Sequence, residues 1–74
     1  MKVYFINPKV RELDGMCPRV DSYIKKAVAL GEEKYGDDFT IAEYKEDSWG
    51  ELMNTWRRYD CNGKLFADKN GRVN

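Results

Sequence analysis

The sequence predicts an α+β fold: a small antiparallel or mixed β-sheet, with elements in β-α-β-β order and one main helix packed on one face. Apolar residues recur at helical spacing across residues 18–35. β-forming residues dominate residues 2–7 and 39–46. Asn62-Gly63 separates two further runs of such residues, which is the pattern of a hairpin. A strand–helix–strand crossover would place the helix across one face of the sheet.

The first strand is predicted over residues 2–7, and both of its faces are apolar. Val3 and Phe5 lie on one face, and Tyr4 and Ile6 lie on the other. This pattern fits a central strand that is covered on two sides better than a strand with one face in water.

The main helix is predicted over residues 18–35, after a loop at residues 8–17 that has no periodic pattern. Pro18 suits the first helical position, where its missing N–H costs nothing. Gly36 suits the left-handed position after the last turn. Gly31 costs roughly 1 kcal/mol in a helix interior, so it marks either an early helix end or a close backbone approach. The apolar stripe consists of Val20, Tyr23, Ile24, Ala27, Val28 and Tyr35.

A second strand is predicted over residues 39–46, and the segment after it is ambiguous. Ser48-x-x-Glu51 resembles a capping box, and apolar residues keep helical spacing as far as the hairpin. The last of these residues favour β-structure and lead directly into the turn. We therefore expect a short helical turn at residues 48–53, followed by a strand at residues 55–61.

The C-terminal part is predicted to form a hairpin. Asn62-Gly63 favours a two-residue turn in which both positions have positive φ. Residues 64–68 return as the second strand. Asn70-Gly71 offers another turn, but only three residues follow it. We therefore expect residues 69–74 to be a frayed tail of a single domain, 1–74.

Composition and charge narrow the class of protein. The formal net charge is zero, which argues against a protein that simply coats nucleic acid or an anionic membrane. Residues 31–51 are acidic and the segments on either side are basic, which gives either a charge dipole or an ordinary mixed surface. Cys17 and Cys61 are too few cysteines for a typical small secreted domain. No apolar run has the length of a signal peptide or a membrane span, so we expect a cytoplasmic protein with reduced thiols.

The motif Asp-x-Asn-Gly occurs twice, at residues 60–63 and 68–71, and invites a calcium interpretation. An EF-hand loop starting at the first unit would place Lys64 and Leu65 where a ligand and a glycine are needed, and the second unit lies too near the end. The chain has no His, which removes most zinc sites and the commonest general base. Adjacent carboxylates suit solvated loops better than a catalytic cleft. We expect no metal, no cofactor and no catalytic residue.

The same region resembles one unit of the YD repeats found in large bacterial β-strand shells. The match consists of Tyr59-Asp60-x-x-Gly63-x-Leu65 followed by Asp68-x-x-Gly71. It spans about 13 of the 74 residues and is made chiefly of turn residues. The resemblance implies a hairpin and carries no function.

The candidate protein-binding residues lie close together in the sequence: Trp49, Trp56, Arg57, Arg58 and Tyr59. Trp, Tyr and Arg are the types most enriched at binding hot spots. Three interpretations remain open: a core tryptophan with solubilising arginines, a protein contact, or arginines on phosphates with rings stacked on bases. On a strand, Trp56 and Arg58 would share one face, and Arg57 and Tyr59 the other. The nucleic-acid interpretation would use Arg57, Arg58, Lys64, Lys69 and Arg72.

The small size, the aromatic and charged composition and the strand–helix–strand–hairpin order resemble the small proteins that bacteriophages and mobile elements encode to disable host systems, including anti-CRISPR proteins. The resemblance implies a non-enzymatic inhibitor that occludes a surface of a larger bacterial protein or nucleoprotein complex in the host cytoplasm. Residues 49–59 would supply the anchors, and the acidic residues 32–47 would steer the chain toward a basic surface. A nucleic-acid-binding module is the alternative. A homodimer that covers the second face of strand 2–7 is also open.

Overall fold

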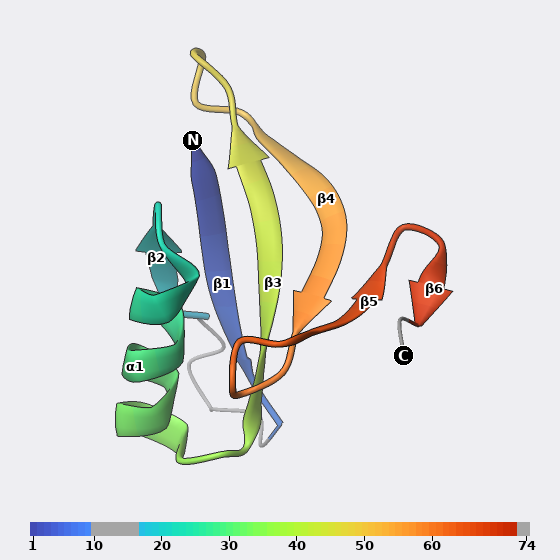
Figure 1. The fold of residues 1–74 in the computed structure, drawn as a ribbon. Helices are drawn as coiled ribbons and strands as arrows, with labels where there is room; N and C mark the ends of the chain where they lie inside the picture. The colour runs from blue at the N-terminus through green and yellow to red at the C-terminus, as the bar shows by residue number, and fades with distance from the viewer. Residues whose placement is uncertain (10–16, 73–74) are drawn as a thin grey trace.

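The computed structural model describes residues 1–9 and 17–72, and in that part of the chain one helix packs on one face of a six-stranded antiparallel sheet (Figure 1). The sheet order is β2-β1-β3-β4-β5-β6. The elements are β1 (Lys2–Pro8), β2 (Arg19–Asp21), α1 (Ile24–Tyr35), β3 (Phe39–Glu46), β4 (Leu52–Tyr59), β5 (Leu65–Asp68) and β6 (Gly71–Arg72). The predicted α+β class is confirmed. Most of the loop expected at residues 8–17 lies outside the described residues.

The helix begins at Ile24, so the prediction that it starts at Pro18 is wrong. Residues 19–21 form β2 instead, which pairs antiparallel with β1 and buries Val20. Ser22 then adopts a φ of 80° and turns the chain into α1. Pairing with β1 outweighs the local helix preference of this segment. The return through β2 also makes β1 and β3 antiparallel neighbours, in place of the expected strand–helix–strand crossover.

The core lies between α1 and the three strands that it covers. Its buried side chains are Tyr4, Ile6, Val20, Ala27, Phe39 and Ile41. Gly31 is buried where α1 faces β3, and a Cβ at this position would overlap the ring of Phe39. The helix continues past this glycine to Tyr35. The close approach that explains Gly31 is therefore to an aromatic side chain.

α1 covers only part of its sheet face. Its 12 residues rise about 18 Å, whereas the eight residues of β3 extend about 26 Å. Figure 1 shows the helix beside the lower half of the sheet, and no helix of the described residues lies over the half nearer the N-terminus. Among the described residues, α1 therefore leaves the upper half of this face uncovered.

The opposite side of the sheet, which we call the helix-free face, has no helix over it in the described part of the chain. Val3 and Phe5 of β1 point to this face, in register with Tyr44 and Ala42 of β3. Val3 and Ala42 are buried, whereas Phe5 and Tyr44 are half-buried. The two apolar faces predicted for the first strand thus correspond to a packed helix face and a partly open second face.

The expected helical turn at residues 48–53 is wrong, because a hairpin loop joins β3 to β4 and β4 already occupies the end of that segment. Asp47 Oδ1 accepts hydrogen bonds from the backbone N–H groups of Trp49 and Glu51, both at 2.9 Å. The backbone N–H of Asp47 in turn donates to the carbonyl of Glu51 at 3.0 Å. The side chain that organises this segment is therefore Asp47, one position before the serine that suggested a helix.

The structure contains the predicted β4–β5 hairpin, but residues 60–64 form a longer loop than the expected two-residue turn. Asp60 Oδ1 accepts hydrogen bonds from the N–H groups of Asn62 and Lys64, both at 2.9 Å, which repeats the arrangement at the β3–β4 loop. Gly63 has a φ of 80°, whereas Asn62 does not adopt positive φ. The aspartate side chain thus replaces the paired positive-φ residues that the sequence predicted.

The second Asp-x-Asn-Gly unit is a turn of the same chemistry. Asp68 Oδ1 accepts a hydrogen bond from the N–H of Asn70 at 2.8 Å, and Gly71 adopts a φ of 109°. Gly71 and Arg72 pair with β5 as the short strand β6. Part of the expected tail at residues 69–74 is therefore paired, and the last two residues lie outside the described chain.

Candidate functional site

A bulge in β4 interrupts the register between β3 and β4. Asn54 is in register with Tyr44 and Arg58 with Ala42, so three residues of β4 lie opposite one residue of β3. Trp56 is the middle residue of the three and has a φ of 66°, which is rare for a bulky residue. Its N–H donates to Asn54 Oδ1 at 2.8 Å. Bulges of this kind redirect side chains next to functional sites.

The bulge places Trp56 beside Arg58. The guanidinium carbon of Arg58 lies 6.0 Å from the ring centroid of Trp56 and 5.9 Å from that of Tyr44, which is cation–π range. Tyr44 meets the ring of Phe5 edge-on, with the centroids 5.3 Å apart. We call Phe5, Tyr44, Arg58 and Trp56 the aromatic row. Arg58 Nη1 also donates to Asn54 Oδ1 at 3.2 Å, so a single amide oxygen bonds both the strained backbone and the guanidinium.

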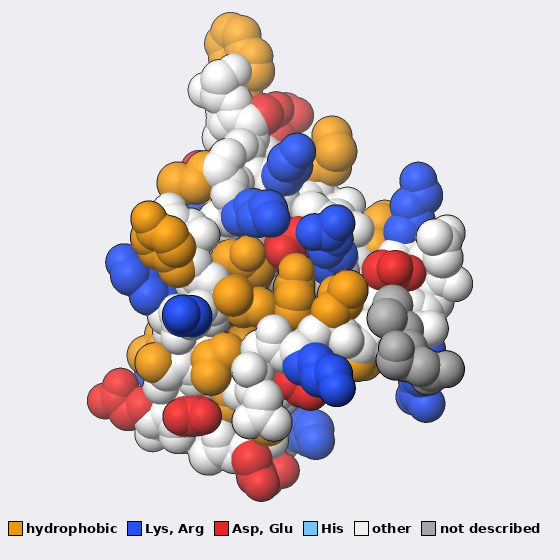
Figure 2. Space-filling model, in the orientation of Figure 1, with side chains coloured by type: hydrophobic (Ala, Val, Ile, Leu, Met, Phe, Trp, Pro, Cys, Tyr) orange, Lys and Arg blue, Asp and Glu red, His pale blue; other side chains and the backbone are white. Residues whose placement is uncertain are grey.

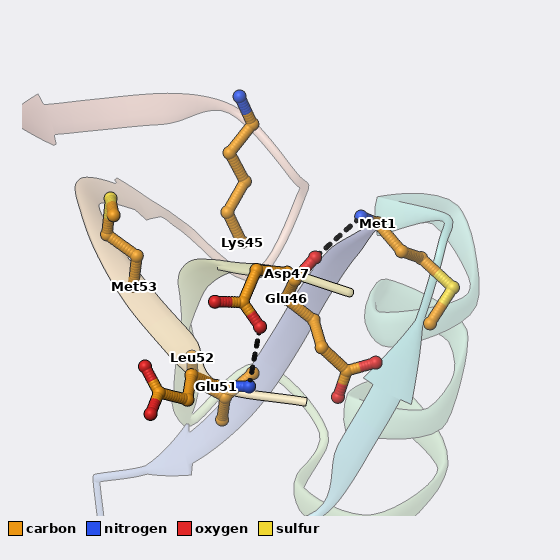
Figure 3. Close-up of a pocket in the computed structure, with 7 residues that line it drawn as sticks. All are labelled: Met1, Lys45, Glu46, Asp47, Glu51, Leu52 and Met53. Atoms are coloured by element: carbon orange, nitrogen blue, oxygen red, sulfur yellow. Dashed lines mark hydrogen bonds between the residues drawn. The ribbon is translucent and has the colours of Figure 1, made fainter. Parts of the chain in front are cut away.

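Two pockets lie near the aromatic row, and Leu52 lines both of them. The pocket on the helix-free face has a volume of about 350 Å³ and is bounded by Phe5, Tyr44 and Cys17 among others. The second pocket, of about 480 Å³, lies where β3 turns into β4 (Figure 3). Met1 and Met53 lie on opposite sides of it in this view. Exposed apolar side chains thus concentrate around β4 and the β3–β4 loop.

The other face of β4 contacts a buried carboxylate. Glu43 is only 1% exposed. Tyr59 donates its hydroxyl hydrogen to Oε2 at 2.8 Å, and Thr55 donates to Oε1 at 3.1 Å. Arg57 Nη1 lies 3.9 Å from Oε1. Both carboxylate oxygens therefore have partners, as a buried charge requires.

Two tyrosines beside Glu43 have raised pKa values. Burial, followed by the charge of Glu43, raises the pKa of Tyr4 to about 12. Burial, followed by the hydrogen bond to Glu43, also raises the pKa of Tyr59. The two rings meet edge-on with centroids 6.2 Å apart. Both phenols therefore remain neutral at physiological pH, and the geometry gives this cluster a structural role.

The five predicted protein-binding residues divide between the two faces. Trp56 and Arg58 belong to the aromatic row, whereas Arg57 and Tyr59 turn toward the carboxylate of Glu43, as strand alternation indicated. Trp49 lies in the β3–β4 loop and is 88% exposed. Of the five, the structure brings Trp56 and Arg58 together in the aromatic row.

The five basic residues of the nucleic-acid hypothesis do not share one face either. Arg58 and Arg72 face the same way through the register of β4, β5 and β6. Arg57 lies on the opposite face, beside the buried carboxylate. Lys64 lies in the β4–β5 loop and Lys69 in the β5–β6 turn, and both are exposed.

Among the residues that shape these sites, Phe5, Tyr44 and Glu43 were not predicted from the sequence. Phe5 was assigned to one face of the first predicted strand but not to a site, and Tyr44 lies within the second predicted strand, residues 39–46, where it was given no role. Glu43 had no signal in the sequence, because its burial depends on hydrogen-bond donors from β4 that only the register brings near.

Among the residues that the structure describes, no group of three His, Cys, Asp or Glu side chains could hold a metal ion. No helix in the same residues is long and apolar enough to cross a membrane. Comparison with protein-family models, with curated proteins and with solved structures finds no match to this chain. Function is therefore inferred from the geometry of the surface.

Proposed function

We propose that this chain is a non-enzymatic binding protein that occludes a surface of a larger macromolecule, with the aromatic row as its docking surface. The observation that carries the proposal is Trp56, which combines a φ of 66° with a side chain that is 56% exposed. A left-handed conformation costs about 1–2 kcal/mol in a non-glycine residue. A half-exposed ring contributes little to the core, so a contact outside the fold accounts for a tryptophan at this position.

The aromatic row is organised before any partner arrives. Arg58 lies within cation–π distance of the rings of both Trp56 and Tyr44, and Asn54 holds its guanidinium by a hydrogen bond. Ordering flexible side chains at an interface costs roughly 0.5–1.5 kcal/mol for each one, so pre-ordered side chains favour binding. Trp, Tyr and Arg are also the residue types that dominate binding hot spots.

The proposed partner is a larger bacterial protein or nucleoprotein complex. Its surface would place an apolar side chain in the pocket between Phe5 and Leu52 and an acceptor on Arg58. The exposed acidic residues after the middle of α1 lie at the opposite end of the molecule from the β3–β4 loop, and they would steer the approach rather than enter the contact (Figures 1 and 2). Occlusion without catalysis is the action that the resemblance to phage-encoded inhibitors implies.

Affinity capture from a bacterial lysate tests the proposal. The tagged chain should recover a partner, and the variants Trp56→Ala and Arg58→Ala should each lose it while keeping the far-UV circular dichroism spectrum. Tyr23→Ala is the matched control, because Tyr23 is a second exposed aromatic residue (63%) beside α1. Undiminished recovery by Trp56→Ala would contradict the proposal.

Single-stranded nucleic acid is the second candidate, because an arginine close to two aromatic rings offers surfaces on which bases can stack. Binding of this kind must weaken steeply as the salt concentration rises. The affinity for nucleic acid should also fall in Arg58→Ala. In the lysate capture, the partner should be recovered without nuclease and lost when nuclease is added. The absence of binding to DNA and RNA at low salt would remove this candidate.

A homodimer that covers the helix-free face would leave the aromatic row unavailable to other partners. Size-exclusion chromatography with light scattering distinguishes this case. The proposed function requires a monomer, or a dimer whose formation is unaffected by Trp56→Ala.

A further inference from the structure

A cationic pocket lies on the half of the helix face that α1 leaves open. It has a volume of about 360 Å³ and draws its lining from β1, β3 and β4: Lys2, Glu43, Lys45, Thr55 and Arg57. Figure 2, which shows the helix face, has Lys and Arg side chains gathered over this part of the sheet, beside a hydrophobic patch. The pocket is separate from the aromatic row, which lies on the other side of the sheet.

The two lysines that line the pocket form a like-charge pair. Lys2 and Lys45 are direct cross-strand partners in the β1–β3 register. Side chains in such positions have Cβ atoms about 4.5–5.5 Å apart, and like charges there are destabilising. Within the described chain, neither lysine makes an ion pair. The register therefore places the Cβ atoms of two lysines close together, and neither ammonium group forms an ion pair within the described residues.

The single carboxylate of the pocket does not relieve this repulsion. Glu43 is held by hydrogen bonds from Tyr59 and Thr55, and its nearest cation is Arg57, at 3.9 Å. Three cationic groups thus face one carboxylate, which leaves two positive charges unbalanced.

We propose that this pocket binds a phosphate dianion, either free or as a phosphate monoester. A dianion matches the two unbalanced charges, and it would turn the repulsion between Lys2 and Lys45 into two favourable contacts. Arg57 supplies a planar fork of N–H groups that can donate hydrogen bonds to phosphate oxygens, and the lysines act as point charges. The volume exceeds that of a phosphate group alone, which leaves room for the first atoms of a monoester substituent.

The proposal is independent of the docking surface and makes a paired prediction. Lys45→Gln should weaken phosphate binding by about fivefold or more, because one direct charge contact is lost. The same variant should raise the stability of the unliganded protein, because it removes one member of the like-charge pair. Lys64→Gln is the matched control: it removes an exposed lysine from the β4–β5 loop, outside the pocket.

The experiment is an NMR titration of the full chain at low ionic strength, at a pH where phosphate is dianionic. Inorganic phosphate and phenyl phosphate are the two probes. The probe that binds with the lower Kd shows whether free phosphate or a monoester is the preferred form. Saturable shifts at the amides of residues 2, 43–45 and 55–57, reduced in Lys45→Gln and unchanged in Lys64→Gln, are expected. No saturable shift with either probe, or an equal loss in both variants, would overturn the proposal.

Discussion

Tyr59 of β4 donates its phenolic hydrogen to Oε2 of Glu43 on the neighbouring strand, at 2.8 Å, and Glu43 is almost fully buried. Tyr59→Phe would keep the ring and leave one oxygen of a buried carboxylate without its donor. A buried acceptor without a partner costs about 1–3 kcal/mol, and we expect the free energy of unfolding to fall by that amount in urea titrations.

Tyr44→Phe is the control for this prediction, because the described residues provide no hydrogen-bond partner for the Tyr44 hydroxyl while its ring packs on Phe5. This variant should unfold at nearly the wild-type denaturant concentration. An equal loss of stability in both variants would show that the ring environment, and not the bond to Glu43, is responsible.

Stability should decline at high pH because Tyr4 is buried, and because it lies beside the same carboxylate. The pKa of Tyr4 rises from 10.0 to about 12 in the folded chain through burial and the charge of Glu43. The folded state thus keeps a proton that the unfolded chain releases, so the stabilisation is complete below pH 10.0 and is lost as the pH rises toward about 12. Denaturant titrations across this window should show a shallower decline in Tyr4→Phe than in the wild type.

Gly31→Ala should change stability in the direction opposite to the one that helix propensity predicts. An alanine in an ordinary helix interior gains about 1 kcal/mol over glycine, but a Cβ here would overlap Phe39. Overpacking of this kind costs about 1–3 kcal/mol, so Gly31→Ala should lower the melting temperature. Adding Phe39→Leu should remove part of the loss caused by the alanine, and a strictly additive double mutant would contradict the steric explanation.

The elements that the sequence predicted well are those whose signal is local. The apolar stripe identified all of α1, Ile24–Tyr35, although the predicted helix also extended back to Pro18. The alternation of Val3 and Phe5 with Tyr4 described the two faces of β1. The errors occurred where a long-range pairing or a side-chain bond outweighed a local preference. Pro18 suggested a helix start, but pairing with β1 makes residues 19–21 a strand.

The candidate site was predictable only in part for the same reason. Strand alternation separated Trp56 and Arg58 from Arg57 and Tyr59 without any structure. No periodic pattern indicates a bulge, so the φ of Trp56 and the role of Asn54 could not be read from the sequence. The burial of Glu43 likewise depends on the register between β3 and β4.

The β3–β4 loop gives a direct comparison of the sequence prediction with the structure. Asp47→Ala removes the acceptor of two backbone N–H groups and should cost about 0.5–2 kcal/mol, as the loss of a helix cap does. Ser48→Ala removes the residue that suggested a capping box and should change stability by less than about 0.5 kcal/mol. The reverse order in chemical denaturation would favour the helical turn.

Trp56 offers a way to measure strain separately from side-chain contacts. Trp56→Ala and Trp56→Gly both remove the ring, so they differ only in the residue that occupies the φ of 66°. Glycine adopts positive φ without the clash between Cβ and the carbonyl oxygen, although it loses more conformational entropy on folding. We expect Trp56→Gly to be more stable than Trp56→Ala by about 0.5–1 kcal/mol in urea unfolding. A more stable alanine variant would mean that the bulge imposes no strain, and the main support for Trp56 as a functional residue would then be lost.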